Sequence, residues 1–136
     1  MTATAIEEAS RLLRIASADF AACVALIEAP GVRFANAAFH GQQAIEKALK
    51  AVLTARGENF GRTHNLVALA GQLSEVGEVL PDTGDLLSLV NPYAVTLRYD
   101  DLDDELLSAH SLRNVVTTMI EWANGRLVAI REMKSN

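Results

Sequence analysis

The chain has 136 residues and a formal net charge of −5, with 50% hydrophobic but only 5% aromatic residues. A chain of this length can bury a core without disulfides, so we treat residues 1–136 as a single domain. The acidic charge argues against a general duplex-binding surface, because binding to phosphates depends on Lys and Arg, although a local basic groove remains compatible with it. No apolar run approaches the roughly 18 residues of a membrane span, so we expect a cytoplasmic protein without membrane contact.

The first long helix is predicted to start at a capping box, Thr4 to Glu7, and to end near Ala29, where Pro30 and Gly31 stop it. Its apolar residues recur at alternating steps of three and four, which is typical of a helix in a bundle. They are Ile6, Ala9, Leu13, Ala16, Phe20, Cys23 and Ile27. The single cysteine of the chain lies in this stripe, so we expect a buried thiol and no internal disulfide.

The second helix is predicted from about Val32 to Arg56, ending at Gly57. Its apolar face is flanked by alanines, which permit the close approach of a neighbouring helix. This face consists of Phe34, Ala38, Ile45, Leu49 and Val52. Thr63 is the candidate N-cap of a short third helix, which carries Leu66, Leu69, Ala70, Leu73 and Val76.

The later part of the chain is less regular. A turn at 81–84 precedes a short helix at 85–90, and 93–101 shows no clear period. The last helix is predicted to start near Asp103, because its acidic residues suit the positive end of a helix dipole, and to end near Met133. Three long helices and one or two short ones predict an all-α fold, an antiparallel up-and-down helical bundle.

A polar stripe is predicted on the second helix. His40, Gln43, Lys47 and Lys50 follow one another at steps of three, four and three and so share one face. This face is either a solvated surface or a groove that attracts phosphate, and both interpretations stay open. His64 is either a local hydrogen-bonding residue at a helix start or a catalyst.

Neither a metal nor a cofactor is expected. His110 has no His, Cys or paired carboxylate nearby in the sequence. Helix capping explains the acidic run with fewer assumptions than a metal site does. That run comprises Asp101, Asp103, Asp104 and Glu105. A phosphate loop, a Gly-rich dinucleotide turn, a nucleophile elbow and an HExxH motif are all missing from the sequence.

Arg98 and Tyr99 combine a fixed cation with a phenol, and Asp100 and Asp101 follow them. Arg98 either pairs with these acids while Tyr99 packs on the bundle, or both side chains bind a ligand. An arginine can bind phosphate with two parallel hydrogen bonds, and a tyrosine can stack on a base. We therefore predict that a shared groove binds an anionic ligand such as a nucleotide phosphate. The residues predicted to form it are Arg98, Tyr99, His40, Lys47 and Lys50.

The segment at 39–53, FHGQQAIEKALKAVL, followed by HNL at 64–66 and by LRY at 97–99, resembles the HEPN domain family over nearly the whole chain. The resemblance implies a helical bundle, frequent homodimerisation and frequent pairing with a small nucleotidyltransferase, often as a toxin–antitoxin system. Many HEPN proteins are ribonucleases with a closely spaced Arg and His in the later half of the domain. This chain departs from that pattern, because no His follows Arg98 until His110. Arg33 and His40 are closer together but lie at the wrong end of the fold, and we interpret them as a coincidence.

These observations lead to one main functional hypothesis and two alternatives. The main one is a nucleotide- or RNA-binding protein that acts with a nucleotidyltransferase partner in a toxin–antitoxin-type pair. One alternative is a metal-independent ribonuclease toxin, with His40 or His64 as general acid–base and Arg98 or Lys50 stabilising the transition state. The other is a non-catalytic dimeric scaffold, so whether the chain is an enzyme stays open. A homodimer is expected because the long Ala-rich helices offer more apolar surface than one small bundle can enclose.

Overall fold

The computed structural model describes the backbone of residues 2–98 and 107–135, with side chains at 4–95 and 107–135. Three long helices form the bundle, namely α1 (Thr2–Glu28), α2 (Phe34–Ala55) and α5 (Ala109–Ser135). Three short elements pack against α2 in a second layer, namely α3 (Leu66–Glu75), α4 (Leu86–Val90) and the 3-10 helix η1 (Asn91–Arg98). The predicted all-α helical bundle is confirmed, and the part of the chain that is described contains no strand.

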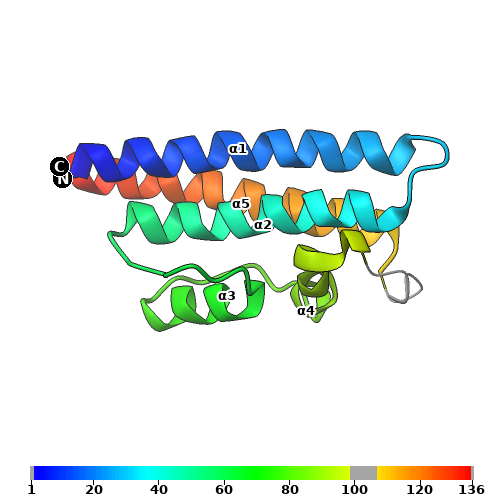
Figure 1. The fold of residues 1–136 in the computed structure, drawn as a ribbon. Coiled ribbons are helices and arrows are strands. Elements are labelled where there is room, and N and C mark those ends of the chain that lie inside the picture. The colour runs from blue at the N-terminus through cyan, green and yellow to red at the C-terminus, as the bar shows by residue number, and fades with distance from the viewer. Residues whose placement is uncertain (1, 99–106, 136) are drawn as a thin grey trace.

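The direction of the helices follows from the way the chain returns between α2 and α5. Figure 1 shows that α1 runs antiparallel to both α2 and α5, and that the segment with α3 and α4 carries the chain back along the bundle. The long helices α2 and α5 therefore run in the same direction, and the Lys134 ammonium near the end of α5 donates to the Ala55 carbonyl at the end of α2 at 2.7 Å. None of the described helices is both long enough and apolar enough to cross a membrane.

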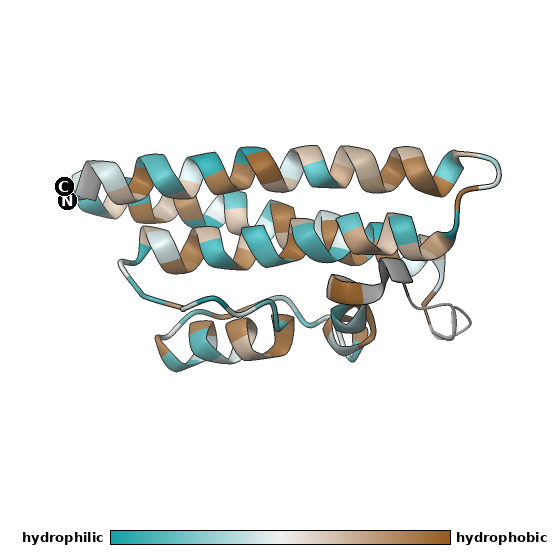
Figure 2. Ribbon diagram, viewed as in Figure 1, coloured by the Kyte–Doolittle hydropathy of each residue, from teal (hydrophilic) through white to brown (hydrophobic). Residues whose placement is uncertain are grey.

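Helix α2 is the centre of the fold and contacts every other helix. Hydrophobic and hydrophilic residues alternate along α1 and α2 in the manner of amphipathic helices (Figure 2). Gly41 of α2 lies close to both α1 and α5, because a Cβ atom there would be 2.8 Å from Leu112 Cδ1 and 3.4 Å from Cys23 Sγ. Cys23 is fully buried, as predicted. A glycine at 41 thus permits α1 and α5 to pack on α2 at this level.

Three predicted helix starts are wrong. Helix α1 begins at Thr2, so Thr4 lies inside it and does not form a capping box. The N-cap of α3 is Asn65, not Thr63, since the Asn65 side chain accepts hydrogen bonds from two backbone N–H groups of the first turn. Helix α5 begins at Ala109, where the Ser108 hydroxyl accepts from the Ser111 N–H, while the acidic residues at 103–105 lie outside the described residues.

Candidate functional site

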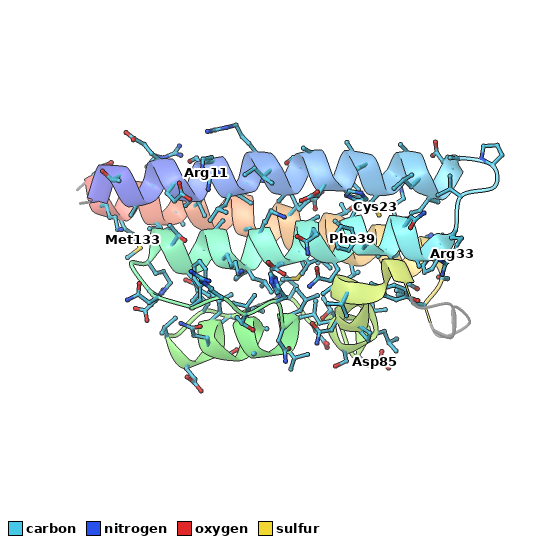
Figure 3. All side chains as sticks on the ribbon, viewed as in Figure 1. Arg11, Cys23, Arg33, Phe39, Asp85 and Met133 are labelled. Atoms are coloured by element: carbon cyan, nitrogen blue, oxygen red, sulfur yellow. The ribbon has the colours of Figure 1, made fainter. Side chains whose placement is uncertain are left out.

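The polar stripe of α2 lies partly buried against α1, where it meets an acidic partner. Asp19 of α1 accepts from the Lys47 ammonium at 3.1 Å, and its other oxygen lies 3.4 Å from Nδ1 of His40. The exposed fractions are 22% for the Lys47 side chain and 18% for the Asp19 side chain. The polar stripe of α2 is therefore not a fully solvated face. Phe39, which is next to His40, is labelled on α2 in Figure 3.

Two further polar residues of α2, which the sequence analysis missed, are buried beside this stripe. The whole-residue exposure is 0% for Gln42 and 4% for Glu46. The Gln42 amide donates to the His64 carbonyl at 2.9 Å and, at 3.4 Å, to the Glu46 carboxylate. In turn, Gln42 accepts from the Gln43 amide at 2.7 Å, and Gln43 accepts from Lys47 at 3.0 Å. A continuous polar network thus runs along α2 from Asp19 to Glu46.

The Glu46 carboxylate joins Lys50 to His64. Its oxygens lie 3.0 and 3.2 Å from Nδ1 of His64, and one of them accepts from the Lys50 ammonium at 3.1 Å. The His64 side chain is 64% exposed, whereas the Lys50 side chain is 12% exposed. A neutral His64 that donates from Nδ1 to Glu46 carries its lone pair on Nε2. An imidazole oriented in this way by a carboxylate can accept a proton from a substrate.

A pocket of about 560 Å³ opens beside Lys50, between α1, α2 and the loop at 57–61. The Lys50 ammonium lies 5.3 Å from the ring centroid of Phe60, within cation–π range. Among the described residues that line the pocket, Lys50 is the one basic residue, and Glu8 and Glu58 are acidic. The lining is completed by Leu12, Thr54, Gly57, Asn59 and Gly61.

The predicted site residues thus fall into two groups of close neighbours. His40 and Lys47 meet at Asp19, Lys50 and His64 meet at Glu46, and the two glutamines connect the groups. The side chain of Arg98 and all of Tyr99 lie outside the described residues, so their place in a shared groove stays a prediction. In the described part of the chain, no group of three His, Cys, Asp or Glu residues is arranged to hold a metal ion.

One pattern in the sequence points to the network that was missed. The residues at 42, 46 and 50 are Gln, Glu and Lys, and those at 43 and 47 are Gln and Lys, so they form two rows at the four-residue spacing of helix neighbours. The row from 42 to 50 lies next to the apolar face that contains Ile45 and Leu49. Polar residues at such a flank indicate a buried polar interaction.

Comparison with known proteins agrees with the resemblance seen in the sequence. The model of the HEPN domain family matches residues 9–126, a range that contains the whole polar network. No curated protein and no solved structure matches the chain. Because the family model covers most of the 136 residues, the chain belongs to the HEPN domain family.

Proposed function

We propose that this HEPN domain binds a nucleotide or RNA and that it acts with a nucleotidyltransferase partner in a toxin–antitoxin-type pair. The observation that carries the proposal is the pocket in which the Lys50 ammonium faces the Phe60 ring at 5.3 Å. An aromatic ring can stack on a base, and an ammonium with three N–H groups can bind a phosphate while it keeps a carboxylate partner. Membership of the HEPN family supports a function concerned with nucleotides or RNA.

The energetics of the polar network also favour a function for it. Glu46 is almost fully buried, and removing a carboxylate and an ammonium from water is costly even when they pair. Apolar side chains of similar volume are often as stabilising as a buried ion pair, or more so. Stability alone therefore does not explain why this network is present, and a role in binding would.

The sequence-based assignment of ligand-binding residues forms part of this proposal. His40 and Lys47 share Asp19, so each would contribute to a ligand only through donors that Asp19 does not use. Arg98 and Tyr99 are proposed to approach the ligand from the end of η1 and the residue after it. Arg98→Ala should weaken nucleotide binding by about 1.5–3 kcal/mol, the range for a hydrogen bond to a charged group.

Direct titration tests the binding proposal. A fluorescently labelled single-stranded oligoribonucleotide and the common nucleotides should bind the wild-type protein, and Lys50→Gln should bind at least tenfold more weakly. Arg113→Gln is the control, because it removes the same charge at a half-exposed position of α5 that does not line the pocket and that pairs with Glu28 at the C-terminal end of α1. A wild-type protein that binds none of these ligands at millimolar concentration contradicts the proposal. Growth inhibition on expression, relieved by a neighbouring nucleotidyltransferase gene, tests the partner separately.

The His64–Glu46 pair favours one second candidate, a metal-independent ribonuclease. In this reaction Nε2 of His64 would accept the proton of a ribose 2′-hydroxyl, whose oxygen attacks the adjacent phosphorus. The bond from phosphorus to the 5′-oxygen then breaks, and that oxygen takes up a proton, giving a 2′,3′-cyclic phosphate and a 5′-hydroxyl. Lys50, also bound to Glu46, would stabilise the charge on the phosphoryl oxygens.

Cleavage assays separate the candidate bases. RNA cleavage in the presence of a chelator should be lost in His64→Ala and kept in His40→Ala if His64 is the base. The opposite result would assign the base to His40. A protein that leaves RNA intact while binding it excludes the ribonuclease and keeps the binding proposal.

A homodimer is proposed as the working form, with one of the long helices at its interface. Family members frequently pair in this way, and a dimer would provide a second site related by symmetry. Light scattering should return about twice the monomer mass of 14.6 kDa at micromolar concentration. A monomer mass would contradict both the dimer and the dimeric-scaffold alternative.

A further inference from the structure

A second groove lies on another face of the bundle, between α1 and α5. Its volume is about 410 Å³, and its buried residues are Leu13 and Leu127, with exposed fractions of 6% and 3%. Polar side chains from both helices stand around these leucines, together with the half-exposed Val128. The polar residues are Ser10, Arg14, Ser17, Asn124 and Arg131. This groove is separate from the pocket beside Lys50, since the two have no lining residue in common.

The groove carries two positive charges that no carboxylate neutralises. It is lined by Arg14 and Arg131 and by no Asp or Glu. Within the described residues, Arg131 donates only to the Ser10 hydroxyl, at 3.4 Å, and the Arg14 guanidinium has no hydrogen bond or ion pair. Most other basic side chains are already paired. These pairs are Arg11 with Glu8, Arg56 and Arg126 with Glu78, Arg113 with Glu28, Lys47 with Asp19, and Lys50 with Glu46.

We infer that the groove between α1 and α5 binds the phosphodiester backbone of single-stranded RNA. The identity of this ligand rests on the proposed function. Each guanidinium can donate two parallel hydrogen bonds to a phosphate, and it keeps its charge at every working pH. Ser10, Ser17 and Asn124 offer further donors along the same groove. In a chain with a net charge of −5, two unneutralised arginines make a local attractive site for an anion.

The two sites would recognise different parts of an RNA strand, because their side chains differ in chemistry. The groove contains no aromatic side chain, so it contacts the backbone and gives no sequence preference. The pocket beside Lys50 offers the Phe60 ring for a base and one ammonium for a phosphate, whose charge the two acidic residues of the lining oppose in part. Helix α1 contributes to both sites, through Leu12 in the pocket and Ser10 in the groove. The two sites therefore border the same part of α1 on different faces of the bundle.

A charge-matched pair of double variants tests this inference. The probe is a fluorescently labelled oligouridylate of about twelve nucleotides, titrated by fluorescence anisotropy at several salt concentrations. Arg14→Gln and Arg131→Gln should each weaken binding about tenfold, and together about 100-fold. The slope of log K against log salt should fall by about 1.4 in the double variant, since each phosphate contact on a single strand contributes about 0.7.

The control is the double variant Arg11→Gln/Arg113→Gln, which removes the same charge from the same two helices. Arg11 and Arg113 are about half exposed, and both lie outside the groove (Figure 3 labels Arg11). Its affinity should stay within about threefold of the wild-type value, and circular dichroism should show the same helix content in all variants. Equal losses in the two double variants, or wild-type binding by Arg14→Gln/Arg131→Gln, would overturn the groove and leave the proposed function intact. A wild-type protein that binds nucleotides but not RNA would overturn the groove alone, and one that binds neither would overturn both.

Discussion

Glu78 is a buried carboxylate in the segment after α3, and it forms ion pairs with arginines next to α2 and in α5. Removing its charge should lower the free energy of unfolding of the protein. Its side chain is 1% exposed and accepts from Arg56 Nη1 at 2.7 Å and from Arg126 Nε and Nη2 at 2.6 and 3.1 Å. Glu78→Gln keeps the shape but removes the charge that both guanidiniums face. Breaking a buried ion pair from one side costs about 3–5 kcal/mol. We expect about 3 kcal/mol, because both arginines are one-third exposed and can turn to water.

Urea denaturation followed by circular dichroism at pH 7 measures this loss. Glu75→Gln is the matched control, since Glu75 is exposed at the end of α3 and its replacement should change the free energy of unfolding by less than about 0.5 kcal/mol. A Glu78→Gln protein as stable as this control would refute the reasoning, because it would mean that the desolvation of Glu78 cancels its three hydrogen bonds.

The pH dependence gives a second, independent check on Glu78. Burial raises the pKa of this carboxyl, but the hydrogen bonds and the positive charges of Arg126 and Arg56 together outweigh burial, so the pKa lies below the ordinary glutamate value. A lowered pKa in the folded state gives stability that is complete above the unfolded pKa. The difference between wild type and Glu78→Gln should therefore be constant near neutral pH and shrink below about pH 4.3, as protons bind. A difference that grows on acidification would contradict the lowered pKa.

Three substitutions, measured by the same denaturation assay, and one thiol-labelling experiment probe the core and a helix end. Gly41→Ala should lower the free energy of unfolding by about 1–3 kcal/mol, because the new Cβ would be 2.8 Å from Leu112 Cδ1. Gly125→Ala is the control, because a Cβ atom there would have no neighbour within 4 Å, and it should raise the free energy of unfolding by up to about 1 kcal/mol. A similar loss of stability in both variants would contradict the close approach of the helices at Gly41. Asn65→Ala should cost about 1 kcal/mol through its lost N-cap, so an unchanged midpoint would speak against that role. Burial raises the pKa of the Cys23 thiol to about 11, so a thiol reagent at pH 8 should label it only on unfolding, and rapid labelling of the native protein would show access to it.

The long helices could be predicted because their signals are local. The apolar period and the breaks at Pro30 and Gly57 place the C-terminal ends of α1 and α2 within about one residue. The start of α3 could not be placed in this way, because Thr63 and Asn65 are both good capping residues. Asn65 also makes a tertiary contact, since its side-chain oxygen accepts a hydrogen bond from the Asn91 amide at 3.3 Å. That contact joins two segments far apart in the sequence, and no local pattern contains it.

The sequence predicts the residues that α2 contributes to the candidate site, but not the residues that they contact. Helix spacing predicts one face of α2 with His40, Lys47 and Lys50, but it does not predict the carboxylates that these side chains contact, Asp19 for the first two and Glu46 for Lys50. Asp19 belongs to α1, and its position opposite Lys47 depends on where α1 packs along the length of α2. Glu46 is on α2 itself, yet its burial depends on the segment at 63–65 that covers it. Partners of a buried charge are set by packing between elements, which a single sequence does not encode locally.

The way the basic side chains are paired determines where an anion can bind to this bundle. A phosphate that approached Lys50 or Lys47 would have to share the ammonium with Glu46 or Asp19, and the nearby carboxylate would oppose its charge. Arg14 and Arg131 bring no such opposition, because no carboxylate lines their groove. At the ion pairs on α2 a ligand would therefore be recognised through its base or through proton transfer at His64 in addition to its phosphate, whereas the arginines suit a ligand recognised through its charge alone. A chain with an overall negative charge can still bind a polyanion where basic groups are left without a carboxylate partner on one face, as Arg14 and Arg131 are in this groove.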